Sequence, residues 1–174
     1  MKKSIIIKRL KAFAIDYLII LIYIGLLFSA TLLISSLFHL NLNNTNPVTG
    51  EMISFTFLTL PVILYFVVCE NGKNAGTQGK RKFGLKIVSN NLTKATIGQL
   101  LLRNWFKFLP WELAHFFVYQ LFYFNSTNTT IPGWVLAGLI APQVLAITYL
   151  LFIVFAKKNR SIYELISQTK VIQQ

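Results

Sequence analysis

Four long apolar stretches run along the chain, separated by polar segments. A helix needs about 17–25 mostly apolar residues to cross a hydrocarbon core about 30 Å thick. Stretches of this length cover residues 12–37, 53–69, 108–124 and 134–156. The third is the weakest, because it contains Glu112, His115 and Gln120. The pattern predicts an all-α membrane protein with four transmembrane helices.

The connector between the second and third stretches, residues 70–107, has a pattern of its own. Its first part, 70–84, is rich in Gly, Lys and Asn and predicts a loop, followed by a short strand at 85–89 and a turn at Asn90–Asn91. From 94 to 107 the period becomes helical, with apolar residues on one face and Gln99, Arg103 and Lys107 on another. This segment predicts an amphipathic helix in the membrane interface before the third span. Packing against the inner end of the helix bundle is an equal alternative.

Composition supports the membrane interpretation. The chain has 174 residues, of which 55% are hydrophobic and 13% are charged, with a mean hydropathy of +0.59. Soluble domains carry about 25% charged residues. So little charge excludes both a soluble globule and a disordered chain. The single cysteine, Cys69, allows neither an internal disulfide nor a cysteine-based metal cluster.

The distribution of the 17 Lys and Arg residues predicts the topology. They lie before the first span, in the connector and in the tail, whereas 39–52 and 125–133 contain none. Four spans place every basic residue on one side, and the positive-inside rule makes that side cytoplasmic. Without a span at 108–124 the basic tail would fall outside. We therefore expect a multi-pass protein of the cell membrane with both termini in the cytoplasm and an uncleaved first helix.

Three ionisable residues within the spans are candidates for chemistry. Asp16 and Glu112 enter their spans at a similar depth, and His115 follows Glu112 by one helical turn. Charged groups inside a membrane usually face the bundle interior and have partners. A cluster of the three would make a proton or cation site. The alternative is structural, with Asp16 neutralised by Arg9 or Arg103 and serving to hold helices together.

Enzymatic chemistry has no support in the sequence. Gly79–Lys80 lacks the glycine spacing and the following Ser or Thr of a P-loop. No nucleophile–base pair and no metal-ligand set is recognisable. We expect no enzyme activity, no cofactor and no nucleic-acid partner.

Three segments together resemble the RDD family of small bacterial membrane proteins. They are RLKAFAID at 9–16, AGTQGKRKFGLKIV at 75–88 and NRSIYELISQTKVI at 159–172. In the last segment the family's His–Asp pair reads Tyr163–Glu164. Leu102–Arg103–Asn104 also fits the family's pattern. The matching positions are Arg9, Asp16, Gly76, Gly79, Lys80, Arg81, Gly84, Arg103 and Glu164.

The resemblance places functional weight on Arg9, Asp16 and Glu164, and it implies a link to transport, since some members are associated with sodium/proton exchange. From the residues alone, Glu164 is expected to form only a weak surface ion pair with Arg160.

Two functions therefore remain open. The first is cation/proton exchange through intramembrane carboxylates, for which four short helices favour a homo-oligomer. The second is a non-catalytic accessory or scaffold module. It would bind a partner membrane protein or anionic lipid headgroups through its basic cytoplasmic face.

Overall fold

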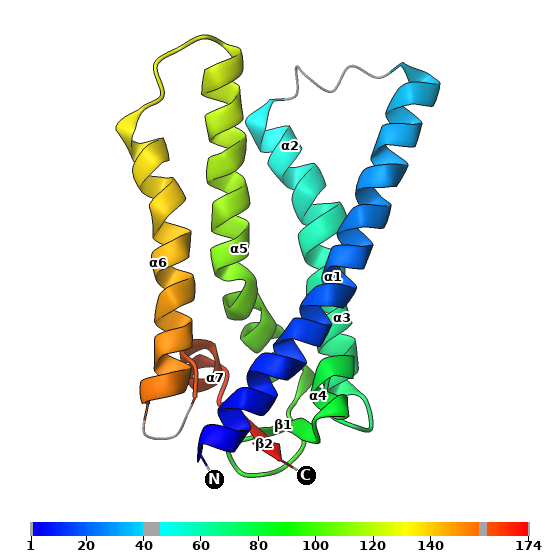
Figure 1. Ribbon diagram of the computed structural model, residues 1–174, viewed down its shortest axis with the longest axis vertical. Helices are drawn as coiled ribbons and strands as arrows, with labels where there is room; N and C mark the ends of the chain where they lie inside the picture. Colours follow the sequence, from blue (N-terminus) through cyan, green and yellow to red (C-terminus); the bar gives the residue numbers. More distant parts are fainter. Residues whose placement is uncertain (1, 40–45, 157–159, 174) are drawn as a thin grey trace.

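The computed structural model describes residues 2–39, 46–156 and 160–173, with side chains from residue 5 onward (Figure 1). Its elements are α1 (Lys2–Phe38), α2 (Pro47–Ser54), the π-helix η2 (Phe55–Thr59), α3 (Leu60–Asn71), α4 (Gln78–Lys82), β1 (Leu85–Ser89), α5 (Ile97–Ser126), α6 (Gly133–Phe155), α7 (Ile162–Ile166) and β2 (Thr169–Gln173). The side chains of Lys2 and Lys3, together with residues Lys157 and Lys158, lie outside this description, although all four belong to the predicted cytoplasmic charge.

Three helical segments are long and apolar enough to cross a membrane: Ile5–Phe38, Pro47–Asn71 and Gly133–Phe155. The second consists of α2, η2 and α3 in continuous succession. Pro61 lies in the first turn of α3, where a missing backbone N–H costs little. A mostly helical membrane protein is therefore confirmed. The predicted fourth span, 108–124, is not among these segments.

The predicted interfacial helix is not a separate element. Residues 97–107 form the beginning of α5, which continues through Pro110 to Ser126. Thr96 and Gln99 form a capping box that starts this helix. Figure 1 shows the first turns of α5 tilted away from the rest, and a proline inside a helix produces such a bend. The apolar face is exposed at Trp105, whereas Arg103 is buried.

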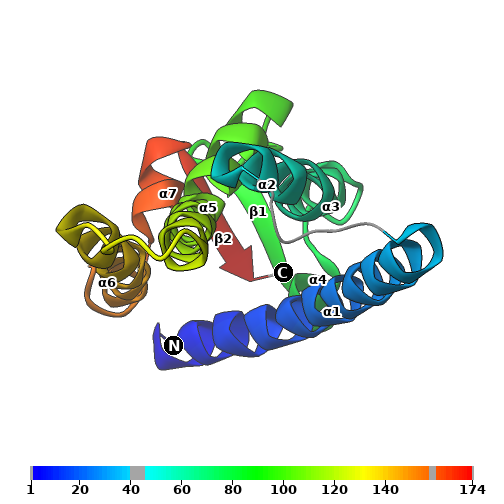
Figure 2. The same cartoon turned by 90° about the horizontal axis from the view of Figure 1, so that it is seen from above.

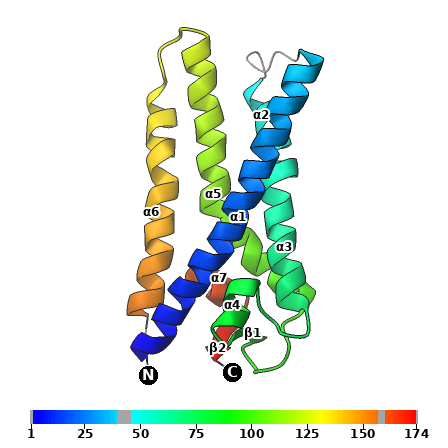
Figure 3. The same cartoon turned by 45° about the vertical axis from the view of Figure 1, so that its right-hand side comes forward.

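Both ends of the chain lie at one end of the molecule, together with α4, β1, α7 and β2 (Figures 1 and 3). We call this the basic end. There β1 and β2 pair antiparallel, from Leu85 opposite Gln173 to Ser89 opposite Thr169. The strand predicted at 85–89 is confirmed, but its partner in the tail was not foreseen. The loop predicted at 70–84 is wrong at residues 78–82, which form α4.

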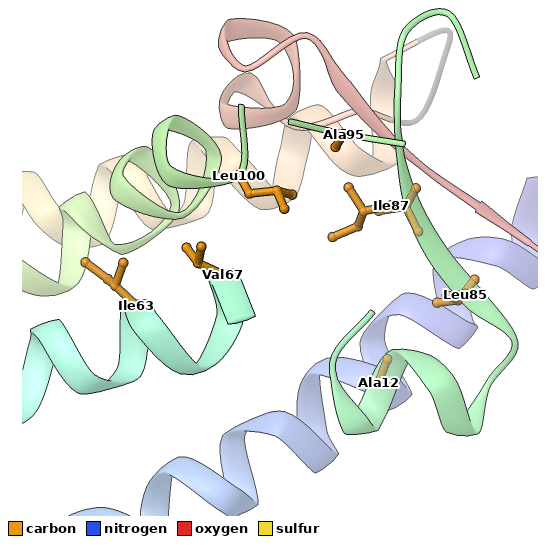
Figure 4. Packing of buried hydrophobic residues seen from close by; sticks show 8 residues of the cluster. Ala12, Ile63, Val67, Leu85, Ile87, Ala95 and Leu100 are labelled. Atoms are coloured by element: carbon orange, nitrogen blue, oxygen red, sulfur yellow. The ribbon is translucent and has the colours of Figure 1, made fainter. Parts of the chain in front are cut away.

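The hydrophobic core is small and lies near the basic end. Its buried members come from α1, α3, α5 and the two strands (Figure 4): Ala12, Ile63, Val67, Leu85, Ile87, Ala95, Leu100 and Val171. Elsewhere large apolar side chains such as Leu18, Leu26 and Phe28 on α1 are exposed. An apolar exterior on long helices is what a lipid environment requires and what water would penalise.

Candidate functional site

Asp16 joins α1 to the start of α4. Its Oδ1 accepts a hydrogen bond from the backbone N–H of Gly79 at 3.0 Å, and its Oδ2 accepts one from Thr77 Oγ1 at 2.5 Å. Tyr65 Oη on α3 lies 3.5 Å from Oδ1. The residue is only 2% exposed. A carboxylate placed on the free N–H groups of a helix start satisfies them and complements the helix dipole. These contacts match the structural alternative for Asp16.

The glycines of the connector are explained by close backbone contacts. A Cβ at Gly79 would lie 2.1 Å from the carbonyl oxygen of Ala12, and one at Gly76 would lie 2.9 Å from that of Leu85. Gly84 has φ +62°, a conformation that other residues adopt only with strain. Side chains at 76 and 79 would push α4 away from α1 and β1.

A chain of alternating charges links five elements at the basic end. Glu164 on α7 pairs with Arg103 on α5 at 3.0 Å and with Arg9 on α1 at 3.3 Å. Glu70 on α3 pairs with Lys80 on α4 at 2.6 Å, and its Oε2 lies 3.7 Å from Arg103 Nε. Buried ion pairs offset their desolvation only when geometry and hydrogen bonding are good. Here Arg103 connects the two carboxylates, so one residue holds both halves of the network.

Hydrogen bonds complete this network. Asn104 donates through Nδ2 to Glu70 Oε2 at 2.8 Å and to the Leu100 carbonyl at 2.9 Å. Arg103 Nη1 bonds Thr169 Oγ1 at 2.9 Å. Glu164 Oε2 also accepts from the backbone N–H of Ser161 at 3.2 Å, which caps α7.

The expected surface pair between Glu164 and Arg160 is wrong. The side chain of Glu164 is only 1% exposed and faces Arg103 and Arg9. Arg160 instead donates to the carbonyl oxygens of Thr169 and Glu164. The error arose because neighbours in sequence were taken as partners, whereas the actual partners lie on other helices.

Charge and burial perturb two groups of α7. Burial alone would raise the pKa of the Glu164 carboxyl, but the guanidinium groups of Arg103 and Arg9 outweigh it and hold this pKa below its ordinary value of 4.5. Burial, with the negative charge of Glu164, raises the pKa of Tyr163 to about 12. At neutral pH the network therefore contains an ionised Glu164 beside a neutral Tyr163.

The structure does not unite Asp16, Glu112 and His115. The hydrogen-bond partners of Asp16 lie on α3 and α4, whereas Glu112 is on α5 and faces the carboxyl of Glu51 on α2. His115 Nδ1 lies 3.0 Å from the Trp111 carbonyl oxygen. Among the described residues, no group of three His, Cys, Asp or Glu side chains is placed to hold a metal ion.

Sequence reasoning missed Glu51, Glu70 and Asn104. Glu51 was assigned to the loop at 39–52, but α2 already begins at Pro47. Glu70 was assigned to the connector although it ends the second apolar stretch. A signal existed for both, since the chain has only five acidic residues and each therefore merited a search for a partner.

Apolar helices around a small charged core at one end define an integral membrane protein. The sequence profile of the RDD family matches residues 4–168, nearly the whole chain, and the protein belongs to that family. No curated protein and no solved structure gives a significant match.

Proposed function

We propose that this RDD-family protein exchanges protons for a monovalent cation across the membrane, with Glu51 and Glu112 as the exchange site. The observation that carries the proposal is the facing pair of carboxyl groups on α2 and α5. Two carboxylates within hydrogen-bonding reach in apolar surroundings cannot both be ionised unless a cation lies between them. A shared proton and a bound cation are thus mutually exclusive occupants, which is the basis of exchange.

The surroundings of the pair support this role. The four ion pairs of the described residues involve neither Glu51 nor Glu112. The Oε2 atom of each is buried and accepts no hydrogen bond from the described residues. Carboxylate oxygens are ligands that hard cations favour. The pair therefore retains coordinating capacity that Glu70 and Glu164 have already used.

The backbone beside the pair is irregular in a way that favours a functional site. The π-helix η2 begins four residues after Glu51, and π-turns inside helices frequently occur at functional sites. The Tyr23 hydroxyl on α1 donates to the carbonyl of Phe57 within η2. Interrupted helices also form the ion sites of many transporters. His115, one turn from Glu112, retains Nε2 as a proton acceptor when Nδ1 donates to Trp111.

The topology that this function needs has four crossings. Figure 1 has α5 running antiparallel beside α6 over most of its length, and the ring of Phe117 on α5 occupies the space that a side chain at Gly138 on α6 would take. Small residues permit such close packing between membrane helices. If α5 crosses with α6, the basic end faces the cytoplasm, as the positive-inside rule requires. Exchange by so few helices favours a homo-oligomer.

Proton movement in proteoliposomes tests the proposal. Purified protein is reconstituted with an internal pH indicator, and sodium, potassium or lithium is added outside. We expect a cation-dependent pH change that is lost in Glu51→Gln and Glu112→Gln and is partly kept in Glu112→Asp, the matched variant that preserves the acid. A wild-type signal that Glu112→Gln leaves unchanged would refute the assignment.

A second candidate is the accessory module that binds a partner through the basic face. The observation in its favour is that Arg81 and Lys82 are exposed at the basic end, whereas Lys80 is engaged by Glu70. Co-purification of a membrane protein that disappears in the double variant Arg81→Gln/Lys82→Gln, but not in Lys94→Gln, would support it. Retention of that partner by the double variant would count against it.

A further inference from the structure

A cavity of about 550 Å³ lies between α1 and the neighbouring helices α3, α5 and α6. It exists because α1 packs chiefly on α4, so that its apolar length stands apart from α5 and α6 (Figure 2). Residues from both sides line the space, such as Phe13 and Ile20 on α1 and Leu150 and Ile153 on α6. Pockets of about 300–1,000 Å³ hold small organic ligands. This cavity is large enough for part of an amphiphile.

The lining changes character along the cavity. Its greater part is apolar, but its basic end is formed by four cations, Arg9, Lys80, Arg103 and Lys107, and by two carboxylates, Asp16 and Glu164. Asp16 is occupied by Thr77 and Gly79, and Glu164 by two arginines. Positive charge therefore prevails where the apolar walls end.

Lys107 is the cation that the network leaves over. The ion pairs of the described residues include Arg9, Lys80 and Arg103 but not Lys107. Its Nζ lies 3.3 Å from the centroid of the Phe66 ring and lines the cavity. A cation–π contact is worth much less than the hydration that a buried ammonium loses. An anion entering the cavity would restore that loss.

We propose that this cavity binds one anionic glycerophospholipid, with its phosphate against Lys107 and an acyl chain between α1 and α6. Charge complementarity selects the headgroup, and the apolar walls select the chain. Basic pockets between membrane helices near the cytoplasmic side are suited to such headgroups. The site is separate from the Glu51–Glu112 pair, neither of which lines the cavity.

Lipid titration followed by native mass spectrometry tests the proposal. Full-length delipidated protein in detergent is titrated with dioleoyl-phosphatidylglycerol or dioleoyl-phosphatidylcholine, which share their acyl chains. We expect the anionic lipid to bind about ten-fold more tightly, as for one charge-assisted contact of about 1.4 kcal/mol. Lys107→Gln should remove this preference. Lys94→Gln, at an exposed lysine outside the cavity, should keep it.

Further arms separate the alternatives. Equal binding of the two lipids to the wild type would overturn the proposal. So would equal losses in Lys107→Gln and Lys94→Gln, which would indicate general surface charge. Competition by soluble glycerol phosphate at the same concentration would assign an anion site without a lipid chain. Ala146→Phe adds bulk to the α6 wall and should weaken binding of both lipids; unchanged binding would place the lipid elsewhere and overturn the proposal even if Lys107→Gln failed to fold.

Discussion

The backbone N–H of Gly79 donates to Asp16 Oδ1 at 3.0 Å, while the carbonyl oxygen of Ala12, one turn before Asp16, lies where a side chain at position 79 would begin. One short stretch of α1 thus both binds and sterically limits the start of α4. Two positions of the RDD pattern, distant in sequence, form a single helix-to-helix joint. Their pairing explains why an acid and a glycine occur together without any need for catalysis.

Gly79→Ala should separate α1 from α4. Its Cβ would meet backbone at 2.1 Å, which cannot move aside as a flexible side chain would. Overpacking of this kind costs about 1–3 kcal/mol. Thermal unfolding in detergent should show a lower Tm by about 2–4 °C per kcal/mol. Gly98→Ala, where a Cβ meets nothing within 4 Å, is the control and should leave Tm equal or higher. Equal Tm values for the two variants would contradict the contact.

Asp16→Ala should lower stability without abolishing exchange. The substitution leaves the Gly79 N–H and the Thr77 hydroxyl without their acceptor, at a cost of about 1–3 kcal/mol. Asp16→Asn keeps one acceptor oxygen and should lose less. Flux per folded protein in liposomes should match the wild type in both variants. Loss of flux at unchanged Tm would instead place Asp16 in the ion path.

Glu164→Gln should be strongly destabilising. It leaves Arg103, which is 2% exposed, beside a neutral group, and removing one member of a buried ion pair costs about 3–5 kcal/mol. Glu112→Gln is the matched control, because the ion pairs of the described residues do not involve Glu112. Its Tm should stay near that of the wild type. A Glu164→Gln protein as stable as this control would show that the network contributes little.

Acid should weaken the same network. The pKa of Glu164 is lower in the folded protein than its ordinary 4.5, so ionisation of this carboxyl favours folding at every pH above 4.5. That contribution is lost as the pH falls from 4.5 toward the folded-state pKa. The Tm difference between wild type and Glu164→Gln should therefore be constant at about pH 6–7 and shrink below about pH 4.5. A difference that persists at the lowest pH would show that packing, not charge, separates the two proteins.

The four-crossing topology predicts where cysteines react. In a Cys69→Ser background, Thr129→Cys lies in the loop between α5 and α6, and Asn74→Cys lies near the basic end. A membrane-impermeant maleimide should label Thr129→Cys in right-side-out vesicles. It should label Asn74→Cys only after permeabilisation. Protection of both positions before permeabilisation would mean that α5 does not cross.

The sequence predicts the local features well. Apolar runs long enough to span a bilayer identify the helices, and the strand at 85–89 follows from its composition and flanking turn. The β2 partner strand and the Arg103–Glu164 pair could not be predicted, because hydrophobic periodicity carries no information about contacts 61 or more residues apart. The acid in α2 was missed for a local reason, since Pro47 starts a helix where a loop was expected.

Infrared difference spectroscopy of the purified protein tests the central claim most directly, because it records carboxyl protonation as a cation binds. Adding sodium, potassium or lithium to the wild type should remove a protonated-carboxyl band and release protons. Asp16→Asn should give the same difference, whereas Glu51→Gln and Glu112→Gln should give none. A cation-dependent band that survives in Glu112→Gln, or no band in folded wild-type protein with any of the three ions, would contradict exchange at the Glu51–Glu112 pair.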